Sequence, residues 1–416
     1  MPTAPFHYQD NVLFCEEVEL AHIAAAAGTP CYVYSAGALR ARFLEYEKAL
    51  EGVPHRVCYA VKANSNLAVL HLLAELGAGF DIVSGGELYR VQQASGDAGS
   101  VVFAGVGKSR EEIDYALESG IHSFNCESEA ELALISSLAG RLGKTASISI
   151  RVNPDVDAMT HPYISTGLRE HKFGIDIAAV EAVYERARQL PNLSLDGVSC
   201  HIGSQLLDPA PLVESAAKLV ALAERLRARG FKIQRLDLGG SIGVPYKAGD
   251  ERPDLAAYLG AVAKLAQGHG LTLFFEPGRF IAAEAGALLT RVLYRKRNGA
   301  KEFIVADAAM NDLLRPALYQ AWHEIVPLRR TAHGTVVADV VGPVCESGDF
   351  LARDREMPNV MPGDGLAVLN AGAYGFVAAS NYNARPRVCE VLVEGDKWRI
   401  VRQRESFADL IRGEAI

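Results

Sequence analysis

From about residue 37 to residue 285, short apolar runs alternate with longer segments in which apolar residues recur at helical spacing. Apolar runs bounded by turn residues predict buried strands, and the segments between them predict helices. The predicted strands are RVCYAVK (56–62), FDIV (80–83), VVFAG (101–105), SFNC (123–126), ASISIRVN (146–153), DGVSCHIG (196–203), RLDLGG (235–240) and LTLFFEPG (271–278). Two predicted helices have a recognisable start, because Ser109–Glu112 and Ser128–Glu131 both have the Ser-x-x-Glu spacing of a capping box.

Strands that alternate with helices over about 250 residues match the arithmetic of a (β/α)8 barrel. A doubly wound open sheet is the other arrangement that the same alternation allows. No Gly-x-Gly-x-x-Gly follows the first predicted strand, as it does in sheets of that kind that bind dinucleotides. We therefore predict an α/β fold with a TIM-like barrel.

Beyond about residue 286 the helical periodicity gives way to short β-rich pieces separated by Gly, Pro and Asp, which predict an all-β domain. These pieces are LLTRVLYRK, EFIVAD, TVVADVVG, GLAVLN, RPRVCEVLVEG and KWRIVRQ. The strand-like CYVYS (31–35) precedes the first barrel helix and is predicted to join this domain. The expected organisation is a barrel domain over 37–285 and a discontinuous β-sandwich or β-barrel domain over 1–36 and 286–416.

Composition and charge narrow the class of partner. The 416 residues are 49% hydrophobic and 22% charged, which is ordinary globular composition. The formal net charge is −8 with no basic block, which argues against nucleic acid or an anionic membrane as a partner. No apolar stretch is long enough for a transmembrane helix, and the start lacks the features of a signal peptide. The seven scattered cysteines show no disulfide spacing, so we expect a cytoplasmic protein.

Ionisable residues gather at the predicted carboxyl ends of the barrel strands, where such barrels carry their catalytic groups. Lys62, Asp81, His201 and Glu276 all lie at or just beyond a strand end. Lysines at strand ends often only reach solvent, and lone histidines are often core residues. An amine in an apolar mouth instead has a lowered pKa and forms Schiff bases, and a flat imidazole ring can pack on a planar cofactor. Glu276 follows a largely apolar run and needs a partner, such as a protonated pyridine nitrogen.

Glycines follow the last two predicted barrel strands. Gly239, Gly240 and Gly243 come after the seventh strand, and Gly278 with Arg279 comes after the eighth. They can serve turn geometry alone. In barrels of this kind, however, the loops after strands seven and eight recurrently bind phosphate through backbone amides. We therefore predict a phosphate site at these loops.

The β-rich half contains one further chemical candidate. Cys345 is followed by Glu346, Ser347, Gly348 and Asp349, which together read as a polar loop. A free cysteine is more often a small buried hydrophobic residue, but in such a loop its thiol can serve as a proton donor.

With these residues in place, the chain resembles the fold type III pyridoxal-phosphate decarboxylases. The matching segments span nearly the whole chain in the order and spacing of that family, and together they are highly specific. They are YAVKAN (59–64), FDIVSGGEL (80–88), HPYISTGLREHKFGI (161–175), HIGSQ (201–205), EPGRF (276–280), DLLRPALY (312–319), CESGD (345–349) and GAYG (372–375). One departure is visible, since Gly239-Gly240-Ser241 stands where the family commonly has three glycines.

The resemblance implies a role for each matching residue of the barrel. Lys62 would bind pyridoxal 5'-phosphate covalently, with Asp81 nearby, and His201 would lie against the cofactor ring. Glu276 would pair with the ring nitrogen so that the cofactor remains a strong electron sink. The phosphate would be bound by Gly240 and by the loop of Pro277, Gly278 and Arg279.

The resemblance also implies how the substrate is bound. Arg279, Arg315 and Tyr319 would bind it, and Tyr374 would contact both substrate and cofactor. Glu346 would recognise its distal amino group, and Cys345 would supply a proton. In this family the cysteine and glutamate come from the neighbouring subunit, so a homodimer with shared active sites is implied. The implied reaction is the release of CO2 from meso-2,6-diaminopimelate to give L-lysine, the last step of lysine biosynthesis.

Three alternatives remain at this point. Decarboxylases that act on ornithine, arginine or carboxynorspermidine share the fold, but ornithine enzymes typically have Cys-Asp-Gly where this chain has Cys-Glu-Ser. Alanine racemase shares the barrel but lacks the CESGD loop. A non-catalytic regulator or carrier of pyridoxal phosphate would need Lys62 but neither Cys345 nor the substrate arginines.

Overall fold

The computed structural model of the protein describes residues 4–156 and 172–416. The chain divides into two compact units, each described here by itself. We call Arg42–Val244 with Glu251–Phe280 the barrel unit, and Met1–Ala41 with Pro245–Asp250 and Ile281–Ile416 the β unit. The expected domain limits at residues 37 and 285 stay a prediction.

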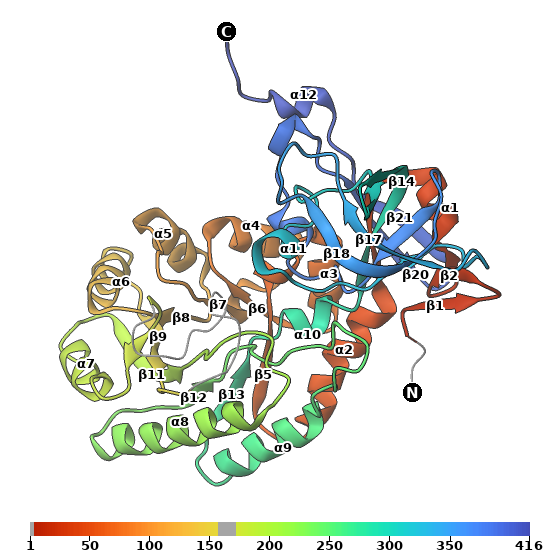
Figure 1. The fold of residues 1–416 in the computed structure, drawn as a ribbon. Helices are drawn as coiled ribbons and strands as arrows, with labels where there is room; N and C mark the ends of the chain where they lie inside the picture. The colour runs from red at the N-terminus through yellow and green to blue at the C-terminus, as the bar shows by residue number, and fades with distance from the viewer. Residues whose placement is uncertain (1–3, 157–171) are drawn as a thin grey trace. The chain divides into compact units, whose positions relative to one another are not determined.

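The barrel unit contains a closed barrel of parallel strands (Figure 1). Each strand pairs with the next along the chain, and the last pairs with the first through Leu273 and His55, which closes the ring. The strands are β5 (His55–Ala60), β6 (Gly79–Ile82), β7 (Val101–Phe103), β8 (Ser123–Cys126), β9 (Ala146–Asn153), β11 (Leu193–Ser199), β12 (Arg235–Asp237) and β13 (Thr272–Phe275), with the short β10 (Ile175–Asp176) beside β9. All eight predicted strands are therefore confirmed, and the open sheet is excluded.

Helices follow most of these strands and cover the outside of the barrel (Figure 1). They are α2 (Ala36–Ala49), α3 (Leu67–Glu75), α4 (Gly85–Gln93), α5 (Arg110–Ser119), α6 (Glu129–Arg141), α7 (Val180–Ala187), α8 (Ala210–Ala228) and α9 (Leu255–Ala266), with the 3₁₀ turns η1 (Val61–Ala63) and η2 (Ala98–Ser100).

The two predicted capping boxes have different outcomes. At α5 both halves are present, since the Ser109 hydroxyl accepts from the Glu112 amide and the Glu112 carboxylate accepts from the Ser109 amide. At α6 only the first half forms, between the Ser128 hydroxyl and the Glu131 amide. The Glu131 carboxylate instead accepts from the buried amine of Lys108 at 2.6 Å, so the prediction of a full box is wrong there.

The first predicted strand is shorter than its apolar run. Strand β5 ends at Ala60, and Val61–Ala63 form the 3₁₀ turn η1. Lys62 therefore lies in a turn just beyond the end of the strand, and not in the strand itself. The turn explains how an apolar run can be buried while the side chain of Lys62, which follows it, is 36% exposed.

The β unit is built on a second sheet, with strand order β18-β17-β15-β14-β4-β20-β21 and with β16 and β19 joined to it through β14. Its strands are β4 (Cys31–Ser35), β14 (Gly286–Asn298), β15 (Lys301–Ala306), β16 (Ile325–Pro327), β17 (Thr335–Val341), β18 (Phe350–Pro358), β19 (Gly365–Val368), β20 (Cys389–Glu394) and β21 (Lys397–Arg402). Strand β4 lies between β14 and β20, so the predicted contribution of CYVYS to this sheet is confirmed.

The remaining elements include two features that the sequence pattern missed. One is the three-stranded antiparallel sheet of β1 (Phe6–Gln9), β2 (Val12–Cys15) and β3 (Val18–Glu19), which packs with α1 into an apolar cluster around Leu20, Val33 and Val391. The other is β18, whose charged residues hid its alternation. The short helices are α1 (Leu20–Ala27), α10 (Arg279–Ala282), α11 (Arg315–Tyr319) and α12 (Phe407–Leu410), with the 3₁₀ turns η3 (Phe376–Ala378) and η4 (Tyr382–Ala384). Among the described residues, no helix combines the length and the apolar character needed to cross a bilayer.

Candidate active site

Lys62 and Asp81 form an ion pair at the carboxyl ends of two neighbouring barrel strands. Asp81 lies in β6 and is fully buried, while Lys62 lies in η1 after β5. Burial raises the pKa of Asp81, and the nearby Lys62 ammonium opposes that rise. A positive group at this position is therefore favoured by an acid that the barrel has removed from water.

Glu276 is buried just beyond β13 and belongs to a cluster of polar groups inside the barrel mouth. Its Oε1 accepts a hydrogen bond from Asn125 Nδ2 at 3.1 Å, and the same nitrogen donates to Asp237 Oδ2 at 2.8 Å. Burial, with Asp237 and Asp81 as negative neighbours, raises the pKa of Glu276 well above its usual range. This site therefore favours a partner that shares a proton with Glu276.

His201 lies just beyond β11, where its ring faces the loop after β12. The Gly240 amide and the Ser241 hydroxyl are each 3.4 Å from His201 Nδ1. Burial and the cation of Arg151 lower the pKa of His201 well below its usual value, so its ring is neutral at pH 7. Arg151 is itself held by Glu127 at 2.8 Å.

The glycines after β12 and β13 are required by close packing of the two loops. A Cβ at Gly240 would lie 1.7 Å from the Glu276 carbonyl oxygen, and a Cβ at Gly278 would lie 2.9 Å from that of Ala63. Gly239 has φ +65°, in the left-handed region, and a Cβ there would lie 2.6 Å from His201 Nδ1. The loops therefore expose backbone where any side chain would clash, which is the geometry that phosphate-binding loops require.

Arg279 and Pro277 complete the barrel set. Arg279 is 5% exposed, and its guanidinium donates to Ser204 Oγ at 2.9 Å, within the HIGSQ segment. The Pro277 carbonyl accepts from the Ala60 amide at 3.2 Å, which ties this loop to β5. The barrel unit thus brings together the eight barrel residues that the sequence singled out, namely Lys62, Asp81, His201, Gly240, Glu276, Pro277, Gly278 and Arg279.

In the β unit, Arg315 opens α11 and is 8% exposed. Its Nη1 lies 2.8 Å from His323 Nε2, and its guanidinium lies 4.5 Å from the centre of the Tyr246 ring. Because arginine only donates, His323 Nε2 accepts, and Nδ1 carries the hydrogen that goes to the Leu369 carbonyl at 2.8 Å. Arg315 is thus rigidly held, and Tyr319 is half-buried at the end of the same helix.

The loop of Cys345 and Glu346 is ordered, yet both side chains are exposed. The Asp349 carboxylate accepts from the amides of Met310 and Val344, each at 2.7 Å. The Cys345 amide donates to Asn383 Oδ1 at 2.7 Å. These hydrogen bonds of Asp349 and of the Cys345 amide fix the backbone of the loop, while the Cys345 thiol and the Glu346 carboxylate are exposed.

Tyr374 is half-buried and has φ 56°, a conformation that is strained for a residue with a side chain. Backbone strain of this kind persists where the surroundings impose it and is frequent at functional sites. The neighbouring glycines explain the fold here, since a Cβ at Gly375 would lie 2.5 Å from the Ala371 carbonyl oxygen.

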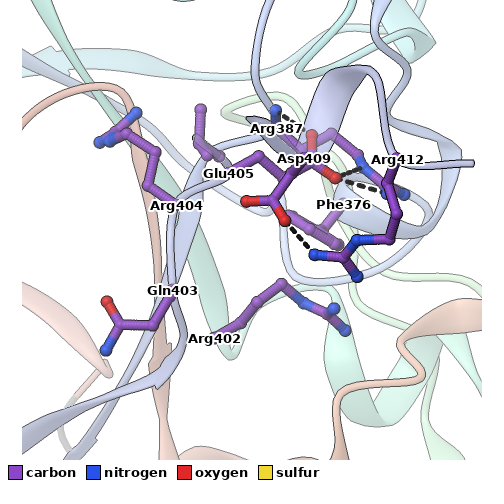
Figure 2. A pocket seen from close by; sticks show the side chains of 9 residues that line it. Phe376, Arg387, Arg402, Gln403, Arg404, Glu405, Asp409 and Arg412 are labelled. Carbon is purple, nitrogen blue, oxygen red and sulfur yellow. Dashed lines mark hydrogen bonds and ion pairs between the residues drawn. The ribbon is translucent and has the colours of Figure 1, made fainter. Parts of the chain in front are cut away.

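The β unit also contains a cavity of about 560 Å³ lined by arginines (Figure 2). Three of these arginines form ion pairs or hydrogen bonds with nearby residues of the same unit. Arg387 pairs with Glu405 at 2.6 Å, Arg412 pairs with Asp409, and Arg404 donates to the Pro30 carbonyl at 2.7 Å. The contacts of Glu405 with Arg387 and of Arg404 with Pro30 hold the C-terminal segment to other parts of the β unit, whereas Arg412–Asp409 is a local pair within that segment.

Several residues of the site escaped the sequence analysis. Asn125 and Asp237 lie inside predicted strands, and their only sequence clue is a polar residue within an apolar run. Glu87, whose carboxylate accepts from the Val83 amide, has a pKa raised to about 7 by burial. No sequence pattern pointed to His323, because its contact with Arg315 is formed only when the chain folds. Residues 161–171 of the HPYISTGLREHKFGI segment lie outside the described residues.

The barrel residues fit pyridoxal phosphate on three observations. An amine stands at the mouth, a buried acid with a raised pKa stands deeper, and glycine-lined backbone lies at the loops after the last two strands. In addition, the buried Asp81 Oδ1 and Asn125 Oδ1 lack a hydrogen-bond partner among the described residues. A planar polar ligand with a basic ring nitrogen and a phosphate matches this set.

Replacing Gly240 with alanine tests the fit of these loops. The new Cβ would overlap the Glu276 carbonyl, so the two loops must separate. We expect affinity for pyridoxal phosphate to fall about tenfold or more, measured by absorbance titration of the cofactor-free protein. The matched control is Gly260→Ala within α9, where a Cβ meets nothing within 4 Å. Unchanged affinity in Gly240→Ala would contradict this account of the loops.

Comparison with known proteins agrees with the site. Residues 36–283 match the family of pyridoxal-dependent decarboxylases, over its pyridoxal binding domain. The class defined by barrel and site is thus the pyridoxal-phosphate-dependent decarboxylases, whose cofactor the protein shares.

The full chain narrows this class further. It is 54% identical to the diaminopimelate decarboxylase of Pseudomonas aeruginosa over 412 residues, with 99% of each chain covered. The crystal structure of the Helicobacter pylori diaminopimelate decarboxylase complexed with L-lysine has a TM-score of 0.91 and 44% identity, and covers 95% of this chain and 98% of that one. The corresponding M. jannaschii complex has a TM-score of 0.93 and 37% identity, with 99% and 98% covered. The chain belongs to the diaminopimelate decarboxylase family.

Proposed function

We propose that the protein is a carboxy-lyase that releases CO2 from meso-2,6-diaminopimelate and yields L-lysine, in the last step of lysine biosynthesis. The observation that carries this proposal is the 54% identity to a diaminopimelate decarboxylase from one end of the chain to the other. The complex of the H. pylori relative with L-lysine, the expected product, supports it.

The barrel residues bind and orient the cofactor in this proposal. When bound, pyridoxal phosphate supplies an electron sink for the charge left by departing CO2. The Lys62 amine would hold it covalently beside Asp81, and the neutral His201 ring would pack against it. Glu276 would share a proton with the ring nitrogen. The backbone of Gly240 and of Pro277–Arg279 would bind the phosphate.

The substrate residues suit an amino acid with two zwitterionic ends. The buried guanidiniums of Arg279 and Arg315 are fixed donors for carboxylates, because Ser204 and His323 orient them. Tyr319 and Tyr374 contact the substrate, and the exposed Glu346 recognises its distal ammonium. A diamine precursor such as ornithine lacks the second carboxylate that such cations bind.

Cys345 delivers the proton to the carbon that carried the departing carboxylate, in our proposal from a second subunit. The support is that Cys345 and Glu346 face outward on a loop held from behind by Asp349. A homodimer in which each subunit completes the site of the other would cover both side chains.

We also assign the protein to the cytoplasm and the cofactor to a domain over 37–285. All seven cysteines are free, and six of them are buried, so the fold uses no disulfide. That usage fits a reducing compartment.

The substrate assignment is tested by a decarboxylation assay with a panel of amino acids, with and without added pyridoxal phosphate. We expect CO2 release from meso-diaminopimelate to exceed that from ornithine about 10²-fold, because ornithine leaves a buried cation without its carboxylate. Comparable rates on the two substrates would contradict the assignment and favour an ornithine-type enzyme. Racemisation of alanine by the pure protein would instead indicate an alanine racemase.

A further inference from the structure

The amide of Asn125 bridges two buried carboxyl groups. A single nitrogen, Nδ2, donates to Asp237 Oδ2 at 2.8 Å and to Glu276 Oε1 at 3.1 Å. The three residues come from β8, β12 and the end of β13, and each is at most 8% exposed. Glu276 is thus held by a residue that the mechanism above does not use.

The bridge is itself fixed on both sides. The main-chain carbonyl of Asn125 accepts from Lys108 Nζ at 2.8 Å, and Lys108 is anchored to Glu131 at 2.6 Å. On the other side, Asp237 Oδ1 accepts from the Gly239 amide at 3.0 Å. Asn125 and Asp237 therefore present a preorganised frame to Glu276.

The charges around Glu276 are unbalanced. Asp237 from β12 and Asp81 from β6 are negative neighbours, and Lys62 after β5 is the positive neighbour. The Cys58 thiol of β5 also faces these acids, and burial raises its pKa well above its ordinary value, so it stays neutral. Lys62 already pairs with Asp81. Asp237 and Glu276 thus form a second acidic pair, which a proton or a cation between them stabilises.

We propose that Asn125 and Asp237 are positioning residues, which hold Glu276 in place and keep the ring nitrogen of bound pyridoxal phosphate protonated. Asn125 fixes the Glu276 carboxylate, and the charge of Asp237 favours the ring with its proton. With the cofactor bound, the Glu276 carboxyl group would give its proton to the ring nitrogen, so one O–H bond would break and one N–H bond would form. This inference rests on the cofactor of the family and not on the proposed substrate.

The role of Asp237 is tested by nuclear magnetic resonance of the holoenzyme loaded with cofactor that carries ¹⁵N in the ring. We expect the ring of the wild type to stay protonated up to about pH 9, and its apparent pKa to fall by about one unit or more in Asp237→Asn. Asp237→Glu keeps the charge and should keep the ring protonated. An unchanged titration in Asp237→Asn, or an equal loss in Asp237→Glu, would overturn the proposal.

The role of Asn125 is tested by a double-mutant cycle on cofactor affinity. We expect Asn125→Ala to weaken binding of pyridoxal phosphate about tenfold in the wild type, and much less in a Glu276→Gln background, because the bridge acts through Glu276. The matched control is Asn153→Ala, which removes a buried amide of β9 that donates to the Phe173 carbonyl. An effect of Asn125→Ala that is equal in both backgrounds would indicate a merely structural role and overturn the proposal.

Both readouts are taken without substrate. Failure to decarboxylate diaminopimelate would therefore leave them unaffected, and the proposed function and this inference fail separately. Circular dichroism of each variant confirms that the measured protein is folded. If Asp237→Asn does not fold, the comparison of wild type with Asp237→Glu and the Asn125 cycle still decide the question.

Discussion

Replacing Lys62 with alanine is expected to lower CO2 release by about 10³-fold or more and to remove the visible absorbance of the bound cofactor. The amine is the group that holds the cofactor covalently, and no second lysine is paired with Asp81 among the described residues. Loss of the ammonium also leaves the buried Asp81 without its counter-charge, so Asp81 takes up a proton. The measurements are a CO2 assay and an absorbance spectrum of the purified protein.

Lys62→Arg is the matched control, because it keeps a positive charge beside Asp81 but cannot bind the cofactor covalently. If Lys62 served only as an ion-pair partner, the arginine variant would retain activity and spectrum. We expect it to lose both, as the alanine variant does. A visible band that survives in Lys62→Ala would contradict the role of this residue as the group that holds the cofactor.

The barrel and its principal groups could be predicted because they depend on local patterns. Each strand is an apolar run, several of these runs have a polar residue at or just beyond their end, and in a parallel barrel all these ends meet at one rim. Glu276 could be predicted as a site residue for this reason, since an acid after five largely apolar residues is costly to bury without a partner. Lys62 was found as well, although the run continues past the strand into the turn η1.

The remaining residues of the site could not be predicted, because their roles depend on contacts between distant segments. Asn125 interacts with Glu276 across 151 positions of the sequence. The same holds for Glu131, which has the spacing of a capping box but binds Lys108 instead. His323 reaches Arg315 through a turn whose geometry has no periodic pattern. A polar residue inside an apolar run indicates a buried polar position, but it does not predict which residues form hydrogen bonds with it.

A mixture of Lys62→Ala and Cys345→Ala subunits is expected to recover about a quarter of the wild-type activity, although each variant alone is nearly inactive. In the proposed dimer, Lys62 acts in one subunit and Cys345 reaches that site from the other. Random association makes about half of the dimers mixed, and each mixed dimer contains one site with both residues intact. Co-expression of two differently tagged chains measures the quarter in the unfractionated mixture, and the mixed dimer purified through both tags should have about half of the wild-type activity.

The exposed loop supplies the matched control for this experiment. Cys345→Ala mixed with Glu346→Ala should recover nothing, because both changes lie on the same loop and every site of a mixed dimer then lacks one of the two groups. Recovery in the first mixture and not in the second would locate Cys345 and Lys62 on different subunits of one site. A first mixture that stays as inactive as its parts would contradict the shared site, and would require each thiol to act within its own chain.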